Sequence, residues 1–283
     1  MQQVREIKKR IATVSNISHL TKAMKTLATA RVGSAKQVMK NARVYEEKMS
    51  GVVHDLVSLV PHAGSPLITR HDAGKYAFVI MTADLGFCGT FNHNIIHSAM
   101  DFIDVHKPGE DLFIIAMGGK ILSLLNRWGI PTELSIPRWK TDYGTARVVI
   151  DLCTDMFLSG KVDRVLVLYS RPAMGMKMQA YRDTLLPLSP EEKKKKDRID
   201  YIVEPSSAEA INNILPVYLR AKMFRMMAET RAGELSARVQ SMTNANENAE
   251  NLLSELTLQY YRARQESITS EIIEITSATE TMK

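Results

Sequence analysis

The chain has 283 residues, of which 45% are hydrophobic and 24% are charged, and this composition is ordinary for a globular protein. Its two cysteines, Cys88 and Cys153, are too few for a disulfide framework and favour a reducing compartment. No apolar run reaches the roughly 18 residues of a membrane span, and the first residues lack the apolar core of a signal peptide. We therefore expect neither a secreted nor a membrane-spanning protein, and we read the N-terminus as that of the mature chain.

The net charge of +6 is unevenly distributed along the chain. Residues 5–45 contain ten Lys or Arg residues and one acid, Glu6, whereas residues 228–283 contain nine Glu and five basic residues. A basic segment is one mark of nucleic-acid binding. Pairing of the basic end with the acidic end is the simpler explanation, and it is the one we favour.

Residues 1–60 form the first predicted element, a long helix, because they contain no Pro and only two Gly. At the helical rise per residue this helix would be roughly 90 Å long. Apolar and small residues recur at steps of three and four, which is the spacing of a coiled-coil seam. Two adjacent steps of three, ending at Ile17, predict a stammer that overwinds the coil. The predicted seam consists of Val4, Ile7, Ile11, Val14, Ile17, Thr21, Met24, Ala28, Arg31, Ala35, Val38, Ala42, Tyr45, Met49, Val52, Leu56 and Leu59.

The seam is weakly apolar between Thr21 and Ala42, where it holds Thr, Ala and Arg. Each Ala methyl contributes less than about 1 kcal/mol on burial. A bare two-helix coil of this composition would be marginal. We therefore expect other chains to enclose this part of the helix.

Residues 75–204 follow a different pattern, in which short apolar runs alternate with helical stretches. This alternation predicts a Rossmann-like α/β domain with a mostly parallel sheet. The charged run 189–198 is predicted to be a solvated loop. We expect strands at 75–82, 111–118, 163–170, 176–188 and 198–204, and helices at 91–105, 118–128 and 143–159.

Residues 206–283 form the second predicted long helix, with a capping box of Ser206 and Glu209 at its start and a kink at Pro216. Because so long a helix is not stable alone in water, the two terminal helices must pack together. The sequence therefore predicts an antiparallel two-helix coiled coil that flanks the α/β domain. The seam of the second helix is predicted at Met242, Ala245, Ala249, Leu252 and Leu256.

Motifs for catalysis, cofactors and metals are missing from the sequence. The stretch MGGKIL at 117–122 has Ile directly after its Lys, where a phosphate-binding loop needs Ser or Thr, and no HExxH occurs. We therefore predict no catalytic residue, no cofactor and no metal. One loop stays open to two interpretations: the glycines of TADLGFCGTFN, residues 82–92, either contact phosphate before a helix or form a tight turn around an inert Cys88. We favour the turn.

Three stretches of the sequence, in order, resemble the gamma subunits of rotary ATP synthases along essentially the whole chain. RIATVSNISHLTKAMKTLATAR at 10–31 contains that family's T-K-A-M. GFCGTFN at 86–92 is similar to its G-L-C-G-G-F-N, and LTLQYYRARQESITSEIIEI at 256–275 is similar to its L-x-L-x-Y-N-x-x-R-Q-x-x-I-T-x-E-L/I-x-E-I. The departures are Phe87, Thr90, Tyr261, the TADLG of the loop and the tip at 277–279.

The resemblance implies a function as the non-catalytic central shaft that couples proton flow through a membrane ring to ATP synthesis or hydrolysis. The implied partners are three alpha and three beta subunits, the epsilon subunit and the membrane c-ring, with no nucleic acid and with membrane contact only through the complex. The loop glycines would serve the fold, and no thiol switch is implied. The implied location is the cytoplasmic face of a bacterial plasma membrane.

The resemblance also implies which residues contact partners. Met24 and Lys25 would lie near a lever region of a beta subunit, and the residues of the R-Q-x-x-I-T-x-E motif would meet loops at the narrow waist of the alpha–beta ring. The full set of implied partner-binding residues is Met24, Lys25, Arg238, Arg264, Gln265, Thr269 and Glu271. A solvated coiled-coil face is the alternative for each of them.

Three other functions stay open from the residues. A coiled-coil scaffold without a motor role predicts a stable chain that self-associates. A small-molecule enzyme with nucleotide at Gly86–Gly89 predicts micromolar ATP binding by the isolated chain. A nucleic-acid binder predicts strongly salt-dependent affinity for DNA.

Overall fold

The computed structural model describes residues 2–59, 65–68, 74–172, 178–188 and 207–281. Two compact units make up the fold: a coil unit, Met1–Ala30 with Arg238–Lys283, and a globular unit, Arg31–Ala237. Each long terminal helix contributes to both units. The elements in chain order are α1 (Gln2–Leu59), β1 (Tyr76–Met81), α2 (Phe91–Ile103), β2 (Leu112–Met117), α3 (Gly119–Trp128), β3 (Leu134–Ile136), α4 (Tyr143–Leu158), β4 (Arg164–Pro172), β5 (Met178–Leu186) and α5 (Ser207–Thr281).

The globular unit is built on a five-stranded sheet with the order β3-β2-β1-β4-β5. Strand β1 pairs in parallel with β2 and with β4, and β2 pairs in parallel with β3. Only the pair β4–β5 is antiparallel. The predicted α/β domain with a mostly parallel sheet is therefore confirmed.

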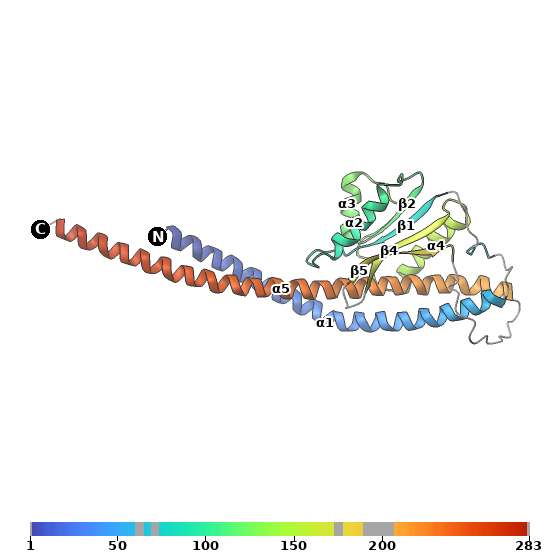
Figure 1. The fold of residues 1–283 in the computed structure, drawn as a ribbon, viewed down its shortest axis with the longest axis horizontal. Coiled ribbons are helices and arrows are strands. Elements are labelled where there is room, and N and C mark those ends of the chain that lie inside the picture. The colour runs from blue at the N-terminus through green and yellow to red at the C-terminus, as the bar shows by residue number, and fades with distance from the viewer. Residues whose placement is uncertain (1, 60–64, 69–73, 173–177, 189–206, 282–283) are drawn as a thin grey trace. The chain divides into compact units, whose positions relative to one another are not determined.

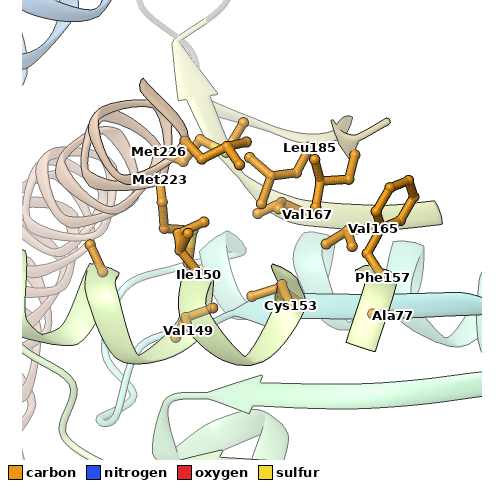
Figure 2. Packing of buried hydrophobic residues seen from close by; sticks show 14 of the residues in the cluster. Ala77, Val149, Ile150, Cys153, Phe157, Val165, Val167, Leu185, Met223 and Met226 are labelled. Atoms are coloured by element: carbon orange, nitrogen blue, oxygen red, sulfur yellow. The ribbon is translucent and has the colours of Figure 1, made fainter. Parts of the chain in front are cut away.

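Side chains of β1 alternate between two apolar cores, one on each face of the sheet. Ala77, Val79 and Met81 point into a core that contains residues of α4 and α5, whereas Phe78 and Ile80 point into a core with α2 and α3. Figure 1 shows α2 and α3 on one side of the sheet and α5 on the other. In Figure 2, Met223 and Met226 of α5 approach Ile150 of α4 over the first of these faces. A sheet covered on both faces explains why its strands read as nearly continuous apolar runs.

Within the globular unit α1 and α5 run side by side in opposite directions (Figure 1). Arg43 Nε lies 2.6 Å from Glu229 Oε1, and Glu46 Oε2 lies 3.5 Å from Arg225 Nε. The later residue of α1 thus pairs with the earlier residue of α5, which shows that the two helices are antiparallel. The predicted packing of the two terminal helices is confirmed.

The covered face of α1 follows a heptad repeat without interruption, and the predicted stammer is wrong. Ile17 is 47% exposed, while its neighbour Ser18 is half-buried and its hydroxyl donates a hydrogen bond to Asn246 Oδ1 of α5 at 3.2 Å. The seam at Val4, Ile7, Ile11 and Val14 therefore continues to Ser18 and Thr21 at unbroken alternating steps. A sustained seven-residue period of this kind imposes a left-handed supercoil.

Farther along α1, three of the predicted seam residues are exposed, and the covered face lies one residue beyond each of them. Arg31, Val38 and Tyr45 were predicted inside but are exposed. The residue that follows each of them is covered instead: Val32, Met39 and Glu46. The predicted positions that are buried or half-buried in this stretch are Thr21, Met24, Ala28, Ala35, Ala42, Met49, Val52 and Leu56.

In the coil unit, one predicted seam residue of α5 is also exposed, and the residue after it takes the covered position. Leu252, predicted inside, is 43% exposed, and Leu253 is half-buried in its place. The fully buried positions of this segment recur every seven residues, which is a coiled-coil period. They are Met242, Ala249, Leu256 and Ala263.

Four predicted strands and all three predicted short helices are confirmed, and one strand was missed. Strand β3 has only three residues, none of them buried, so it lacks the apolar run that marked the others. The predicted strand 198–204, the charged loop 189–198 and the Ser206 cap lie outside the described residues. Helix α5 continues through Pro216. The division into segments 1–60, 75–204 and 206–283 stays a prediction.

Candidate partner-binding surface

All seven residues that the resemblance assigns to partner contacts belong to the coil unit. Arg264, Gln265, Thr269 and Glu271 are exposed on the last part of α5. Thr269 Oγ1 donates a hydrogen bond to the backbone carbonyl of Gln265 at 2.9 Å. This bond does not use the side-chain amide of Gln265, which is exposed. These four side chains therefore have the accessibility that a contact surface requires.

The three remaining residues are more enclosed. Met24 and Lys25 are half-buried on α1, and Arg238 on α5 is only 9% exposed. Met24 lies beside the covered face, where Lys25 takes the seam position between Thr21 and Ala28. Arg238 is thus largely enclosed by its own chain, unlike the four residues near the C-terminal end.

Large apolar side chains on the coil unit are a feature that the motif comparison missed. Helix α1 exposes Ile17, Leu20 and Leu27, of which Leu27 is 61% exposed. The last part of α5 exposes Tyr261, Ile268, Ile272, Ile273 and Ile275 to 46–68%. Because exposed apolar patches mark interaction sites, these residues extend the candidate surface. The signal was present in the sequence as apolar residues outside the seam register.

The α5 residues from 268 to 278 are all exposed. Residues upstream of them are covered every three or four positions, and the last covered positions are Ala263 and Ser267. Ile268, Ile272 and Ile273 therefore present large apolar side chains on the surface of this part of α5. Exposed apolar residues that lie together on one helix are typical of interaction surfaces.

The loop 82–92 after β1 folds onto itself. The side chain of Asn92 accepts a hydrogen bond from Ala83 N at 3.0 Å and donates to Cys88 Sγ at 3.1 Å and to Leu85 O at 3.3 Å. Phe87 and Gly89 adopt positive φ angles of 61° and 57°. These bonds agree with a tight turn that joins β1 to α2, which is the interpretation that the sequence favoured.

Two titratable groups of the globular unit are perturbed by their structural surroundings. Arg220 donates to Asp151 Oδ1 at 2.8 Å, and this bond lowers the pKa of Asp151 below its ordinary value, with Arg147 adding to the effect. Burial raises the pKa of the Cys153 thiol to about 12, which keeps it protonated and unreactive. Among the described residues, no group of three or more His, Cys, Asp or Glu side chains is arranged to hold a metal ion.

A bilayer-spanning helix is not found: within the ranges that the structure describes, none of the helices combines the required length with sufficient apolarity.

Comparisons with known proteins give one consistent result. A family model described as ATP synthase matches residues 3–282. The ATP synthase gamma chain of Trichlorobacter lovleyi is 33% identical over 287 residues, covering 100% of both chains, and that of Desulforamulus reducens is 33% identical, covering 97% of each. Among solved structures, a chain of the Euglena gracilis mitochondrial ATP synthase (OSCP/F1/c-ring, rotational state 3) is similar with a TM-score of 0.71 at 16% identity, covering 99% of this chain and 95% of that one. A central-stalk chain of the Tetrahymena thermophila mitochondrial enzyme gives 0.61 at 19% identity, covering 80% and 99%.

Proposed function

We propose a function from one premise: this chain belongs to the family of ATP synthase gamma chains. It acts as the central rotor subunit of a proton-translocating ATP synthase, and it couples proton flow through a membrane ring to ATP synthesis or hydrolysis by rotation. The observation that carries this proposal is the full-length match, from residue 3 to residue 282, to the ATP synthase family model.

The structure supports the proposal through the coil unit. A rotor that turns against several partner states needs a stiff rod with different surfaces on its different sides. The unbroken heptad seam of α1 supplies stiffness, and the exposed apolar residues supply a surface that differs around the rod. Coupling then follows from differential contacts with distinct states of the partner subunits.

The chain supplies torque and no catalytic group. Its partners are three alpha and three beta subunits, an epsilon subunit and the membrane c-ring, and it meets the membrane only through that complex. The location is the cytoplasmic face of a bacterial plasma membrane. The support for these finer statements is the gamma-chain family and the sequence motifs near Met24 and Arg264.

We assign the partner contacts to Met24, Lys25, Arg238, Arg264, Gln265, Thr269 and Glu271. Gln265 and Thr269 lie one helical turn apart with Arg262, Glu266 and Ser270 around a shallow hollow on α5. A loop of a beta subunit seated there would accept a hydrogen bond from the Gln265 side-chain amide. Arg264 does not line this hollow and would meet a partner on an adjoining face of α5. Exposed Ile268 and Ile272, which follow Arg264 at successive steps of four residues, would bury their side chains in that second contact.

The test is affinity purification of the tagged chain from its host, followed by mass spectrometry. The expected result is co-purification with two larger nucleotide-binding chains that are present in amounts equal to each other. Recovery of the chain only as a self-associated oligomer would favour the scaffold function and overturn the rotor.

A second experiment tests the contact assignment. A disulfide formed between Gln265→Cys and a cysteine placed in the beta-subunit loop should stop ATP-driven rotation, and reduction should restore it. Arg127→Cys, on the exposed end of α3, provides a control thiol outside the proposed surface. Unchanged rotation after complete cross-linking at position 265 would rule out the assigned contact.

A further inference from the structure

A cavity of about 480 Å³ lies in the globular unit between the two long helices and the sheet. One wall is formed by α1 around Ala35 and by α5 from Ala228 to Leu235. The other wall is formed by Asp84, which follows β1, and by Arg138–Thr141, which follow β3. These loops lie at the carboxyl edge of parallel strands, where α/β folds bind ligands. The volume is within the range of small-molecule sites, about 300–1,000 Å³.

Four cationic side chains line this cavity: Arg31, Arg138, Lys140 and Arg231. Arg231 is paired, since its Nη1 lies 2.6 Å from Glu234 Oε2. Within the described ranges, the guanidinium groups of Arg31 and Arg138 make no ion pair. The cavity therefore presents positive charge that the described part of the chain does not neutralise.

Arg31 has no role in the coiled-coil seam. The sequence pattern placed it inside the seam, but Val32 occupies the covered position and Arg31 is exposed at the cavity. Val38, two turns farther along α1, was also predicted inside the seam but is exposed and lines the same cavity. The seam residues of α1 and α5 thus leave an open space here, and the side chain at its entrance is a cation.

Asp84 is the only carboxylate among the described residues that line the cavity, and it serves the backbone. Its Oδ1 accepts hydrogen bonds from Gly119 N at 2.9 Å and from Arg138 N at 2.7 Å. Arg138 has a φ of 54°, a left-handed conformation that costs energy for a residue with a Cβ. Asp84 therefore holds Arg138 in a strained conformation at the cavity wall, and such strain concentrates at functional sites.

The floor of the cavity is largely apolar and buried. Trp139 is 9% exposed, and its indole Nε1–H donates to the carbonyl of Thr82 at 3.0 Å. Ala228 and Leu235 are 1% and 4% exposed. The cationic side chains thus surround a floor of buried apolar residues.

We propose that this cavity binds a small oligophosphate anion, held by Arg31, Arg138 and Lys140. Arginine forks match phosphate oxygens in geometry and form charge-assisted hydrogen bonds with them. The anion is either free pyrophosphate or the diphosphate group of a nucleotide. The site goes beyond the rotor function, which requires contacts with protein subunits and no small ligand in this unit.

The test uses the full chain with the substitution Trp128→Phe, which leaves Trp139 as the single tryptophan of the sequence. Pyrophosphate, ADP and sulfate are titrated separately at about 0.15 M salt, where screening suppresses non-specific attraction. The expected result is a saturable change in Trp139 fluorescence with one pyrophosphate or ADP per chain and much weaker binding of sulfate. Equal affinity for both ligands identifies the oligophosphate group as sufficient, and tighter binding of ADP identifies a nucleotide.

Matched variants decide whether the cavity is the site. Arg138→Gln with Lys140→Gln should weaken binding about tenfold or more, because hydrogen bonds to charged groups are stronger than neutral ones and both substitutions remove a charge. Arg127→Gln with Arg164→Gln removes the same charge from exposed positions outside the cavity and should change affinity by less than about twofold. Arg31→Gln, on the exposed face of α1, tests the opposite wall without touching the strained loop. Absence of saturable binding by the folded chain, or equal weakening by the control pair, would overturn the proposal.

Discussion

The guanidinium of Arg43 on α1 lies 2.6 Å from the carboxylate of Glu229 on α5 and joins the two long helices inside the globular unit. Glu229 is only 1% exposed, and its other oxygen lies 3.2 Å from Arg225 Nη1. Arg225 in turn lies 3.5 Å from Glu46 of α1. The helices are therefore held in register by a network of charges that is largely shielded from water.

Removing Glu229 should destabilise the globular unit. We expect Glu229→Ala to lower the free energy of unfolding by about 3 kcal/mol or more, because it leaves Arg225 buried with fewer partners. The matched control is Glu6→Ala, whose pair with Arg10 has side chains 64% and 66% exposed and should change stability by less than about 1 kcal/mol. Urea unfolding followed by circular dichroism measures both, and equal effects would contradict the role of the network.

Gly118 and Gly160 should respond differently to the same substitution. Both have positive φ angles, 107° and 72°. A Cβ at Gly118 would collide with the backbone carbonyl of Thr82, whereas a Cβ at Gly160 would meet no atom within 4 Å. We expect Gly118→Ala to cost about 2–4 kcal/mol, and Gly160→Ala about 1 kcal/mol from backbone strain alone. Thermal unfolding of the two variants compares them, and a cost at Gly160 that matches Gly118 would refute the close-approach argument.

The two cysteines should be unreactive in the folded chain. Burial raises the pKa of the Cys153 thiol to about 12, and Cys88 is 1% exposed. At about pH 8 we expect no alkylation by iodoacetamide until denaturant is added, because the thiolate is the reactive form. Ser123→Cys, at an exposed position on α3, supplies a thiol that should react at once. Mass spectrometry counts the modified thiols, and modification of Cys153 in the native chain would show that its enclosure is incomplete.

We expect Asp151 to make the free energy of unfolding depend on pH in the acid range. Arg220 holds the folded pKa of Asp151 below its ordinary value, so its contribution is present above the unfolded pKa of about 3.9 and is lost as pH falls through the folded pKa. Asp151→Asn should therefore be less stable than the wild type near neutrality, with a gap that narrows below about pH 4. Because the Asp151 side chain is 42% exposed, added salt should also narrow the gap. Unfolding series over pH test this, and a gap that stays constant into acid would exclude Asp151 as its source.

The exposed isoleucines near the C-terminal end should be needed for assembly and not for folding. Ile272→Asp with Ile275→Asp adds charge at positions that are 58% and 68% exposed, so the isolated chain should lose less than about 0.5 kcal/mol of stability. If these residues meet the alpha–beta ring, co-purification of the larger subunits should fall sharply. Val105→Asp, at a 78% exposed position of the globular unit, is the control and should leave assembly unchanged. Normal assembly of the double variant would remove the apolar end of α5 from the proposed surface.

Local patterns of apolar residues were sufficient to predict much of the fold. Strand β1 and the Val165–Tyr169 stretch of β4 are unbroken apolar runs because both faces of the sheet are covered, so short stretches of sequence were enough to identify them. The seven-residue period of α1 was equally visible, because small or apolar residues recur at Thr21, Ala28, Ala35 and Ala42. The candidate contacts at 264–271 came from motif similarity and not from any local physical signal.

Packing against distant segments settled the features that these patterns left open. At the pairs Arg31/Val32, Val38/Met39 and Tyr45/Glu46, either residue satisfies heptad spacing, and the position of α5 against α1 selects the second. Strand β3 exists because the edge of β2 offers hydrogen bonds to three residues with no apolar run of their own. The cationic cavity beside Trp139 likewise arises where segments far apart in the chain meet. A periodicity records which residues share a face of one helix or strand, whereas burial depends on what another element brings to that face.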